Sequence, residues 1–106
     1  MLLPACNETT LDSNGRRRVC SEDAGHLGDH VDVKCYRWEP PLLVHARLHE
    51  RWQDTHHIAL LPSGIWLATA HDPEAPWRSE VEFTAAQLEK MLRLHNPHLV
   101  PRGVTV

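Results

Sequence analysis

The stretch that decides the fold of the N-terminal part of this chain reads Cys20-Ser-Glu-Asp-Ala-Gly-His26-Leu-Gly-Asp-His30. With Cys6 upstream, it places two cysteines and two histidines at the spacing C-x13-C-x5-H-x3-H. Two thiolates and two imidazoles can complete the tetrahedral shell of a structural zinc ion. The spacing therefore predicts a zinc-stabilised segment whose ligands are Cys6, Cys20, His26 and His30.

The residues around these ligands point to a segment that needs a metal in order to fold. Residues 1–35 show no helical or strand periodicity and are rich in Asn, Asp, Ser, Thr and Gly. Asp12-Ser-Asn-Gly15 is typical of a tight turn, which would return the chain so that Cys6 approaches Cys20. Cys35 offers a competing, more local shell with Cys20, His26 and His30. The sequence leaves the choice between Cys6 and Cys35 open, and it also allows that the cysteines bind no metal.

Length and composition limit the classes of protein to which the chain can belong. At 106 residues, with 42% hydrophobic and 24% charged residues, it fits one compact soluble unit. The net charge of −3 and the pI near 6.3 give no overall attraction to nucleic acid or to an anionic membrane, and no run of apolar residues could span a bilayer. Three cysteines fit a metal site plus a spare thiol better than a closed set of disulfides, so we expect a cytoplasmic protein.

The pattern Cys20-x4-Gly25-His26-x-Gly28-x-His30, with a cysteine upstream and Trp38 shortly after, resembles a zinc-binding segment of small uncharacterised actinobacterial and actinobacteriophage proteins. The resemblance covers residues 6–38, about a third of the chain. It implies a zinc shell of Cys6, Cys20, His26 and His30, and a phage or mobile-element origin. It implies no activity, and the additional Cys35 departs from the pattern.

A second part of the chain is expected to follow Trp38-Glu39-Pro40-Pro41, because paired prolines disfavour helix and stiffen the link. We place the boundary there, with a zinc-binding lobe at 1–41 and a sheet plus helix at 42–106 in one compact unit. Alternating apolar residues predict a strand at 43–52, and 57–61 and 65–70 complete a three-stranded antiparallel meander. Thr84 is expected to begin a C-terminal helix. The sequence does not decide whether residues 97–106 add an edge strand to the sheet. The fold class is α+β.

Two groups of polar residues in this second part are candidates for function. In the predicted strand, Arg47, His49 and Arg51 would share one face that could bind a nucleic acid or an acidic partner. The second group comprises the histidines at the ends of the predicted hairpin: His56, His57 and His71.

The missing catalytic set favours a non-enzymatic binding or regulatory module. We expect it to act through a protein partner, with nucleic acid as the second candidate and the oligomeric state undecided. The alternative is a metal-dependent hydrolase or nuclease that uses the histidine group.

Overall fold

The structure is a computed structural model that describes residues 4–97 of the chain. Two helices and three small antiparallel sheets make a small α+β fold, as predicted. No helix within residues 4–97 is long and apolar enough to cross a membrane. The elements in chain order are β1 (Thr9–Leu11), β2 (Arg17–Val19), β3 (His30–Val31), β4 (Arg37–Trp38), α1 (Pro41–Trp52), β5 (His56–Leu60), β6 (Trp66–Ala70), β7 (Ser79–Glu82) and α2 (Ala85–His95).

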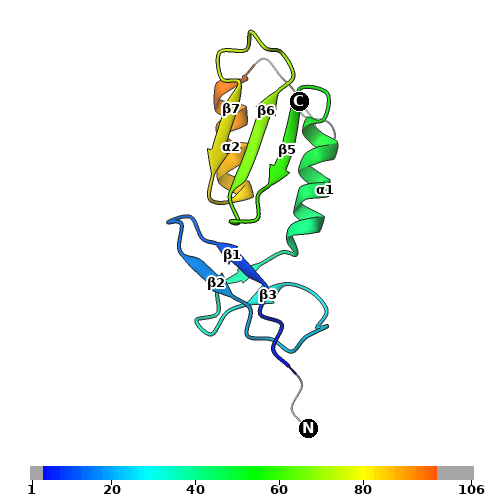
Figure 1. Cartoon of the computed structure of the whole chain (residues 1–106), viewed down its shortest axis with the longest axis vertical. Coiled ribbons are helices and arrows are strands. Elements are labelled where there is room, and N and C mark those ends of the chain that lie inside the picture. The colour runs from blue at the N-terminus through cyan, green and yellow to red at the C-terminus, as the bar shows by residue number, and fades with distance from the viewer. Residues whose placement is uncertain (1–3, 98–106) are drawn as a thin grey trace.

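The molecule is elongated, with an N-terminal lobe (residues 4–40) that extends from one end of a C-terminal lobe (residues 41–97) (Figure 1). Its principal extents are 56 × 25 × 19 Å, and its radius of gyration of 15.6 Å exceeds the ~13 Å that a compact domain of this length would have. The chain passes from one lobe to the other at the proline pair. The predicted boundary at residue 41, between two lobes of one compact unit, stays a prediction.

The N-terminal lobe consists of two short β-hairpins. In the first, β1 pairs with β2, and the predicted turn at Asp12 connects them: the Asp12 carboxylate accepts from the backbone N–H groups of Asn14 and Arg16. In the second, β3 pairs with β4, and the Asp32 carboxylate caps the turn in the same way. An aspartate that binds backbone groups two and four residues further on therefore shapes both turns.

The three-stranded sheet of the C-terminal lobe has the order β5-β6-β7, and both pairings are antiparallel. The predicted hairpin of 57–61 and 65–70 is present as β5 and β6, with Gly64 in the connecting turn at a φ of 95°. The third strand is β7, not the predicted strand at 43–52. Residues 78–83 carry few apolar side chains, so their strand pattern is weaker than that of 43–52.

The predicted strand at 43–52 is wrong, because this segment lies in helix α1. Its buried residues Leu48 and Trp52, with the partly buried Val44, are spaced by four, and a spacing of four satisfies both a strand and a helix. Ala46 separates the two patterns: a strand would bury it with Leu48, but in the helix it is exposed. Good helix formers fill the segment and Pro41 stands at its first position, so local propensity agrees with the helix.

Helix α2 begins where it was predicted. The Thr84 hydroxyl accepts from the backbone N–H of Gln87 at 3.2 Å, which satisfies one of the free N–H groups of the first turn. The Gln87 side chain also bonds back to the cap: its Oε1 accepts from the Thr84 hydroxyl at 3.0 Å, and its amide nitrogen donates to the carbonyl oxygen of Ser13 in the N-terminal lobe. The buried stripe of α2 consists of Leu88 and Leu92.

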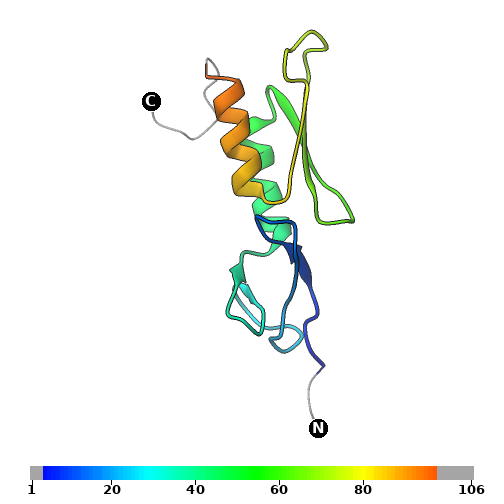
Figure 2. The same ribbon diagram turned by 90° about the vertical axis from the view of Figure 1, so that its left-hand side faces the viewer.

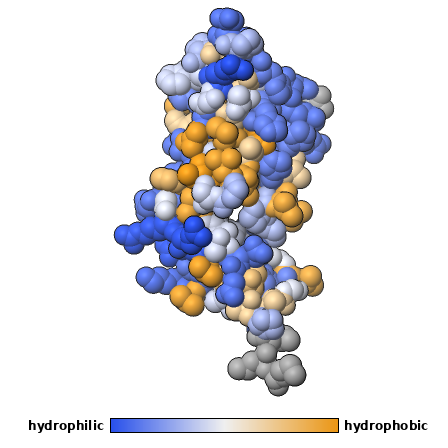
Figure 3. Space-filling model, viewed as in Figure 1, coloured by the Kyte–Doolittle hydropathy of each residue, from blue (hydrophilic) through white to orange (hydrophobic). Residues whose placement is uncertain are grey.

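Both helices cover the same face of the sheet (Figure 2). The core between them is formed by Leu48, Trp52, Ile58, Trp66, Ala68, Leu88 and Leu92, all from the C-terminal lobe. We expected both faces of the sheet to be covered. In the part of the chain that the structure describes, no element covers the face that carries Leu67 and Val81, which forms an apolar area in Figure 3.

The turn of the first hairpin joins the two lobes. The Phe83 ring packs against Gly15 so closely that a Cβ at this position would lie 2.8 Å from the ring. Leu11 lies against Gly64 in the turn between β5 and β6. With the hydrogen bond from Gln87 to Ser13, these contacts hold the hairpin against the end of the sheet. Residues 98–106, which include the undecided edge strand, lie outside the described part.

The core assignment predicts that Leu88→Ala destabilises the protein by about 3 kcal/mol, because it opens a cavity at a fully buried position between α2 and the sheet. Leu94→Ala on the same helix is the matched control. Leu94 is 63% exposed, so its loss changes stability by no more than about 0.5 kcal/mol. Urea unfolding followed by circular dichroism measures both. Equal losses in the two variants would contradict the described position of α2.

Candidate metal centre

The first hairpin brings the two cysteines side by side. Cys6 precedes β1 and Cys20 follows β2, and three backbone hydrogen bonds hold the two segments together: from Cys6 to Glu22 at 2.7 Å, from Asn7 to Cys20 at 3.2 Å and from Cys20 to Glu8 at 2.8 Å. The turn at Asp12 therefore produces the approach of Cys6 to Cys20 that the sequence predicted.

The two histidines reach the same place from the second hairpin and from the loop that precedes it. His30 begins β3, and the neighbouring Val31 carbonyl accepts from the backbone N–H of Ser21, which ties β3 to the end of the first hairpin. His26 lies in the loop, between two glycines that both have positive φ angles, Gly25 at 79° and Gly28 at 83°. The chain therefore bends sharply on both sides of His26.

The four side chains converge on one point. One ligand atom from each of Cys6, Cys20, His26 and His30 lies within 4.8 Å of all the others, which is close enough to hold a metal ion. The Cys6 Sγ is 3.4 Å from His30 Nδ1, and the Cys20 Sγ is 3.4 Å from His26 Nε2. Tetrahedral coordination with ordinary zinc bond lengths separates sulfur from nitrogen by about 3.6 Å. These two sulfur–nitrogen distances are therefore close to those of a tetrahedral ion.

The surroundings of the imidazoles select the ring nitrogens that face the other ligands. The Nδ1 of His26 is 3.3 Å from the Leu27 carbonyl oxygen, so an N–H at this atom leaves Nε2 unprotonated toward Cys20. The Trp38 ring lies over His30, with 5.3 Å between ring centroids and 30° between planes. His30 is only 9% exposed, so one side of the centre is shielded from water.

The electrostatics of the site favour a thiolate at Cys20. Burial acts to raise the pKa of this thiol, but hydrogen bonds from the backbone of Val31 and Glu22 and from the His30 side chain lower it to about 6. The pKa of Cys6 is raised: a backbone hydrogen bond at Glu8 acts to lower it, but burial and the neighbouring Cys20 outweigh that bond. The Leu27 carbonyl raises the pKa of His26.

The shift at Cys20 has a definite sign for stability, opposite to that of the raised pKa values of Cys6 and His26. Folding favours the deprotonated form of Cys20, so its contribution is complete above the ordinary thiol value of 9.0 and is lost as the pH falls through about 6. Protons and a metal ion compete for the same sulfur and nitrogen atoms, so acid also works against metal binding.

Cys35 does not belong to the group that converges. It is exposed and occupies the turn of the second hairpin with a φ of 65°. The hairpin thus carries Cys35 away from the four residues that converge. Of the two candidates for the fourth ligand, the structure brings Cys6 to the centre.

Sequence reasoning missed Arg18, which links the two hairpins beside the candidate centre. Its guanidinium bonds the Asp12 carboxylate at 3.0 Å and the Asp32 carboxylate at 3.1 Å, and it lies 5.1 Å from the centroid of the Tyr36 ring. Burial acts to raise the pKa of Asp32, but turn amides and this shared cation lower the pKa of both carboxyl groups. Arg18 is the last of three consecutive arginines, and nothing in that run distinguishes it from the other two.

The histidines proposed for a hydrolase do not assemble. His56 and His57 are neighbours on β5 and point to opposite faces: His56 is buried under the helices and His57 is exposed. His71 lies 2.8 Å from the Gln53 carbonyl oxygen through its Nε2. Within residues 4–97, the Cys6 group is the only set of three or more histidine, cysteine or acidic ligands placed to hold a metal.

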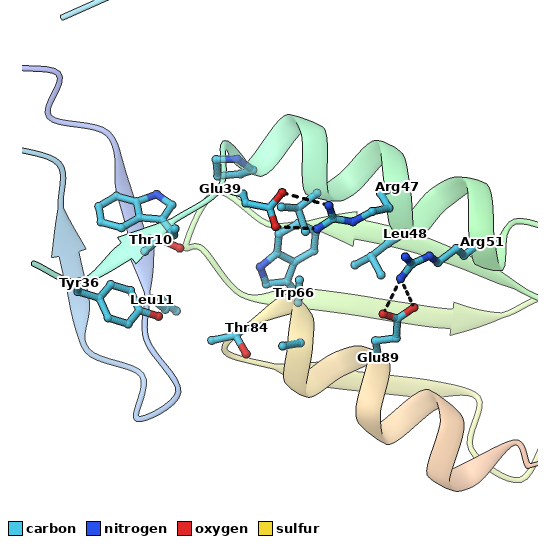
Figure 4. A pocket seen from close by; sticks show the side chains of 15 residues that line it. Thr10, Leu11, Tyr36, Glu39, Arg47, Leu48, Arg51, Trp66, Thr84 and Glu89 are labelled. Carbon is cyan, nitrogen blue, oxygen red and sulfur yellow. Dashed lines mark hydrogen bonds and ion pairs between the residues drawn. The ribbon is translucent and has the colours of Figure 1, made fainter. Parts of the chain in front are cut away.

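The predicted binding face at Arg47, His49 and Arg51 rested on the wrong strand. In helix α1, Arg47 and Arg51 are one turn apart and line a cleft of about 380 Å³ between the lobes (Figure 4). Each arginine is already paired, Arg47 with Glu39 through two hydrogen bonds of 3.0 Å and Arg51 with Glu89 at 2.9 Å. His49 is exposed, and its ring stacks with that of His45, with 6.3 Å between the ring centroids. The three residues do not form one free cationic face.

Comparisons of the chain with protein-family models, with curated protein sequences and with solved structures gave no match. The resemblance of residues 6–38 to small actinobacterial proteins therefore stays a prediction. Function has to be argued from the candidate centre itself.

The choice of Cys6 over Cys35 can be tested with cobalt as a spectroscopic substitute for zinc. Wild type and Cys35→Ser are expected to give the same tetrahedral d–d bands and the same thiolate-to-cobalt charge-transfer intensity. In Cys6→Ser, the charge-transfer intensity should fall by about half, because one of two thiolates is lost. The reverse result, with Cys35→Ser as the defective variant, would identify Cys35 as the ligand.

The role of Arg18 predicts that Arg18→Gln loosens the turn of the second hairpin. Amide hydrogen exchange of Lys34 and Tyr36, whose N–H groups bond Asp32, is expected to accelerate about tenfold. Arg37→Gln, in the same lobe but with an exposed side chain that has no partner among the described residues, removes the same charge and serves as the control. Unchanged exchange in Arg18→Gln would show that the turn holds without the clamp.

Proposed function

We propose that this protein is a small zinc-stabilised binding or regulatory module, encoded by a phage or another mobile element, that acts in the cytoplasm through a protein or nucleic-acid partner. The observation that carries the proposal is the convergence of Cys6, Cys20, His26 and His30 within 4.8 Å. Two thiolates with two imidazoles are the ligand set typical of zinc, whereas Mg²⁺ and Ca²⁺ prefer oxygen ligands.

The ligand count supports a structural role for the ion. Four protein ligands fill a tetrahedral shell, whereas a catalytic zinc ion keeps a position open for water or substrate. Trp38 and the low exposure of His30 further limit access to the centre. A non-enzymatic module is therefore favoured over a hydrolase.

The composition of the N-terminal lobe supports a need for the ion. The buried residues of this lobe, within the described range, are Asp12, Cys20, His30 and Asp32, and the apolar core lies entirely in the C-terminal lobe. Polar groups and hydrogen bonds alone rarely outweigh the entropy of ordering a segment of this length. Zinc would supply the missing free energy, since a site absent from the unfolded chain couples metal binding to folding.

The proposal predicts one tightly held zinc ion per chain by elemental analysis. Cys20→Ser should lose the ion and the folded N-terminal lobe together, seen as collapse of the amide chemical-shift dispersion of residues 5–38. The signals of the core residues in the C-terminal lobe should persist, because their packing includes no residue before Pro41.

Ser21→Ala serves as the matched control for Cys20→Ser. It removes the exposed hydroxyl that donates to the Val31 carbonyl next to the ligands, and it leaves all four ligands in place, so the ion should be kept. Two outcomes would refute the proposal. One is a purified wild-type chain without metal that is fully folded in both lobes and gains no stability from added zinc. The other is a Cys20→Ser variant that retains stoichiometric zinc.

A further inference from the structure

A groove of about 590 Å³ lies between the two hairpins of the N-terminal lobe. One wall consists of residues 16–21, which include β2, and the other consists of residues 32–34 in the turn between β3 and β4. Cys20, a ligand of the candidate metal centre, is one of the lining residues. The groove is thus built by the same elements that the metal would hold together.

Three cationic side chains of this groove are unpaired. Arg16, Arg17 and Lys34 are exposed, and none of their head groups has an ion pair or hydrogen bond to another residue in the described range 4–97. In Figure 3, strongly hydrophilic side chains project at the level of the β1–β2 hairpin. Elsewhere, glutamates neutralise the arginines of the two helices: Arg47, Arg51 and Arg93. Among the described residues, unpaired exposed cations also lie outside the groove, at Arg37 and Arg78, whereas Arg16, Arg17 and Lys34 share one concave surface.

The one acidic residue among those that line the groove does not cancel this charge. Both oxygens of Asp32 are engaged: Oδ1 accepts from the backbone N–H groups of Lys34 and Tyr36, and Oδ2 accepts from Arg18. Arg18 is in turn shared with Asp12, so this trio carries a net charge of −1. The three unpaired cations outweigh that charge, and they lie on walls that the Arg18 clamp holds in place.

A solvated basic hairpin is the simpler interpretation, and the net charge of −3 argues for it. Two observations favour a ligand. Charges beyond about 10 Å are screened at ordinary ionic strength, so an incoming polyanion responds mainly to the charges in and next to the groove. In addition, the cations come from two hairpins and flank a concave surface, whereas solvated charges have no reason to line a groove.

We propose that this groove binds the phosphate backbone of a nucleic-acid strand without regard to sequence. Arg16, Arg17 and Lys34 would contact phosphates, while the exposed Val19 and Val33 would lie against sugars. No aromatic side chain lines the groove in the described residues, so bases have no stacking platform there. The inference rests on the proposed function and deepens it by naming the partner.

The test compares two double variants that lower the charge by the same amount. Arg17→Gln/Lys34→Gln removes two groove cations. Arg37→Gln/Arg78→Gln removes two exposed cations outside the groove, neither of which has a side-chain partner in the described residues. Fluorescence anisotropy with a fluorescein-labelled oligothymidylate of about 12 nucleotides, and with a duplex of equal length, measures affinity between about 50 and 200 mM NaCl.

The groove variant is expected to bind at least about tenfold more weakly than wild type, and its slope of log affinity against log salt should be shallower by about 1.5. The control variant should stay within about twofold of wild type. A stronger loss with the oligothymidylate identifies a single strand as the ligand, and a stronger loss with the duplex identifies double-stranded backbone; either supports the proposal.

Three results would overturn the proposal: wild-type affinity weaker than about 1 mM at the lowest salt, equal losses in the two variants, or binding to phosphatidylserine vesicles without binding to either oligonucleotide. Zinc content measured on the same samples keeps the two proposals separate. A metal-free wild type with groove-dependent binding would refute the zinc module alone. A zinc-loaded protein that ignores both oligonucleotides would refute the groove alone.

Discussion

The N-terminal lobe has no apolar core among its described residues, and the rest of its structure depends on how that lack is met. Before Pro41, the buried side chains that the structure describes are two aspartates, a cysteine and a histidine. Each is held by polar contacts: the aspartates by turn amides and Arg18, and Cys20 and His30 by the convergence with Cys6 and His26. The lobe is thus held by an ionic clamp at one place and by contacts among the four candidate metal ligands at another.

Contacts from both hairpins link the two lobes. Trp38 lies over His30, and two residues later the chain enters the proline pair and helix α1. Glu39, beside Trp38, binds Arg47 within that helix. The first hairpin meanwhile packs its turn against Phe83 and the β5–β6 turn. The candidate metal ligands are therefore connected to the cleft between the lobes through a short stretch of chain and through packed side chains.

Helix α1 shows where pattern reasoning failed and why. Val44, Leu48 and Trp52 are spaced by four, a multiple of the strand period and close to one helical turn, so they could not distinguish the two structures. The predicted binding face assumed that strand, because Arg47 and His49 share a side only at period two. The real partners of the two arginines are glutamates that lie 8 and 38 residues away, a relation that no local pattern carries.

By itself, the sequence indicated Cys20, His26 and His30 as candidate ligands, and it predicted the turn that brings Cys6 to Cys20, the β5–β6 hairpin and the start of α2. These features depend on residue chemistry and on contacts within one or two turns of chain. Only the tertiary structure decided that Cys6 and not Cys35 joins the other ligands, that 43–52 is helical, that β7 completes the sheet and that Arg18 clamps two hairpins. Those outcomes depend on which distant segments share a surface, and spacing along the chain does not encode that relation.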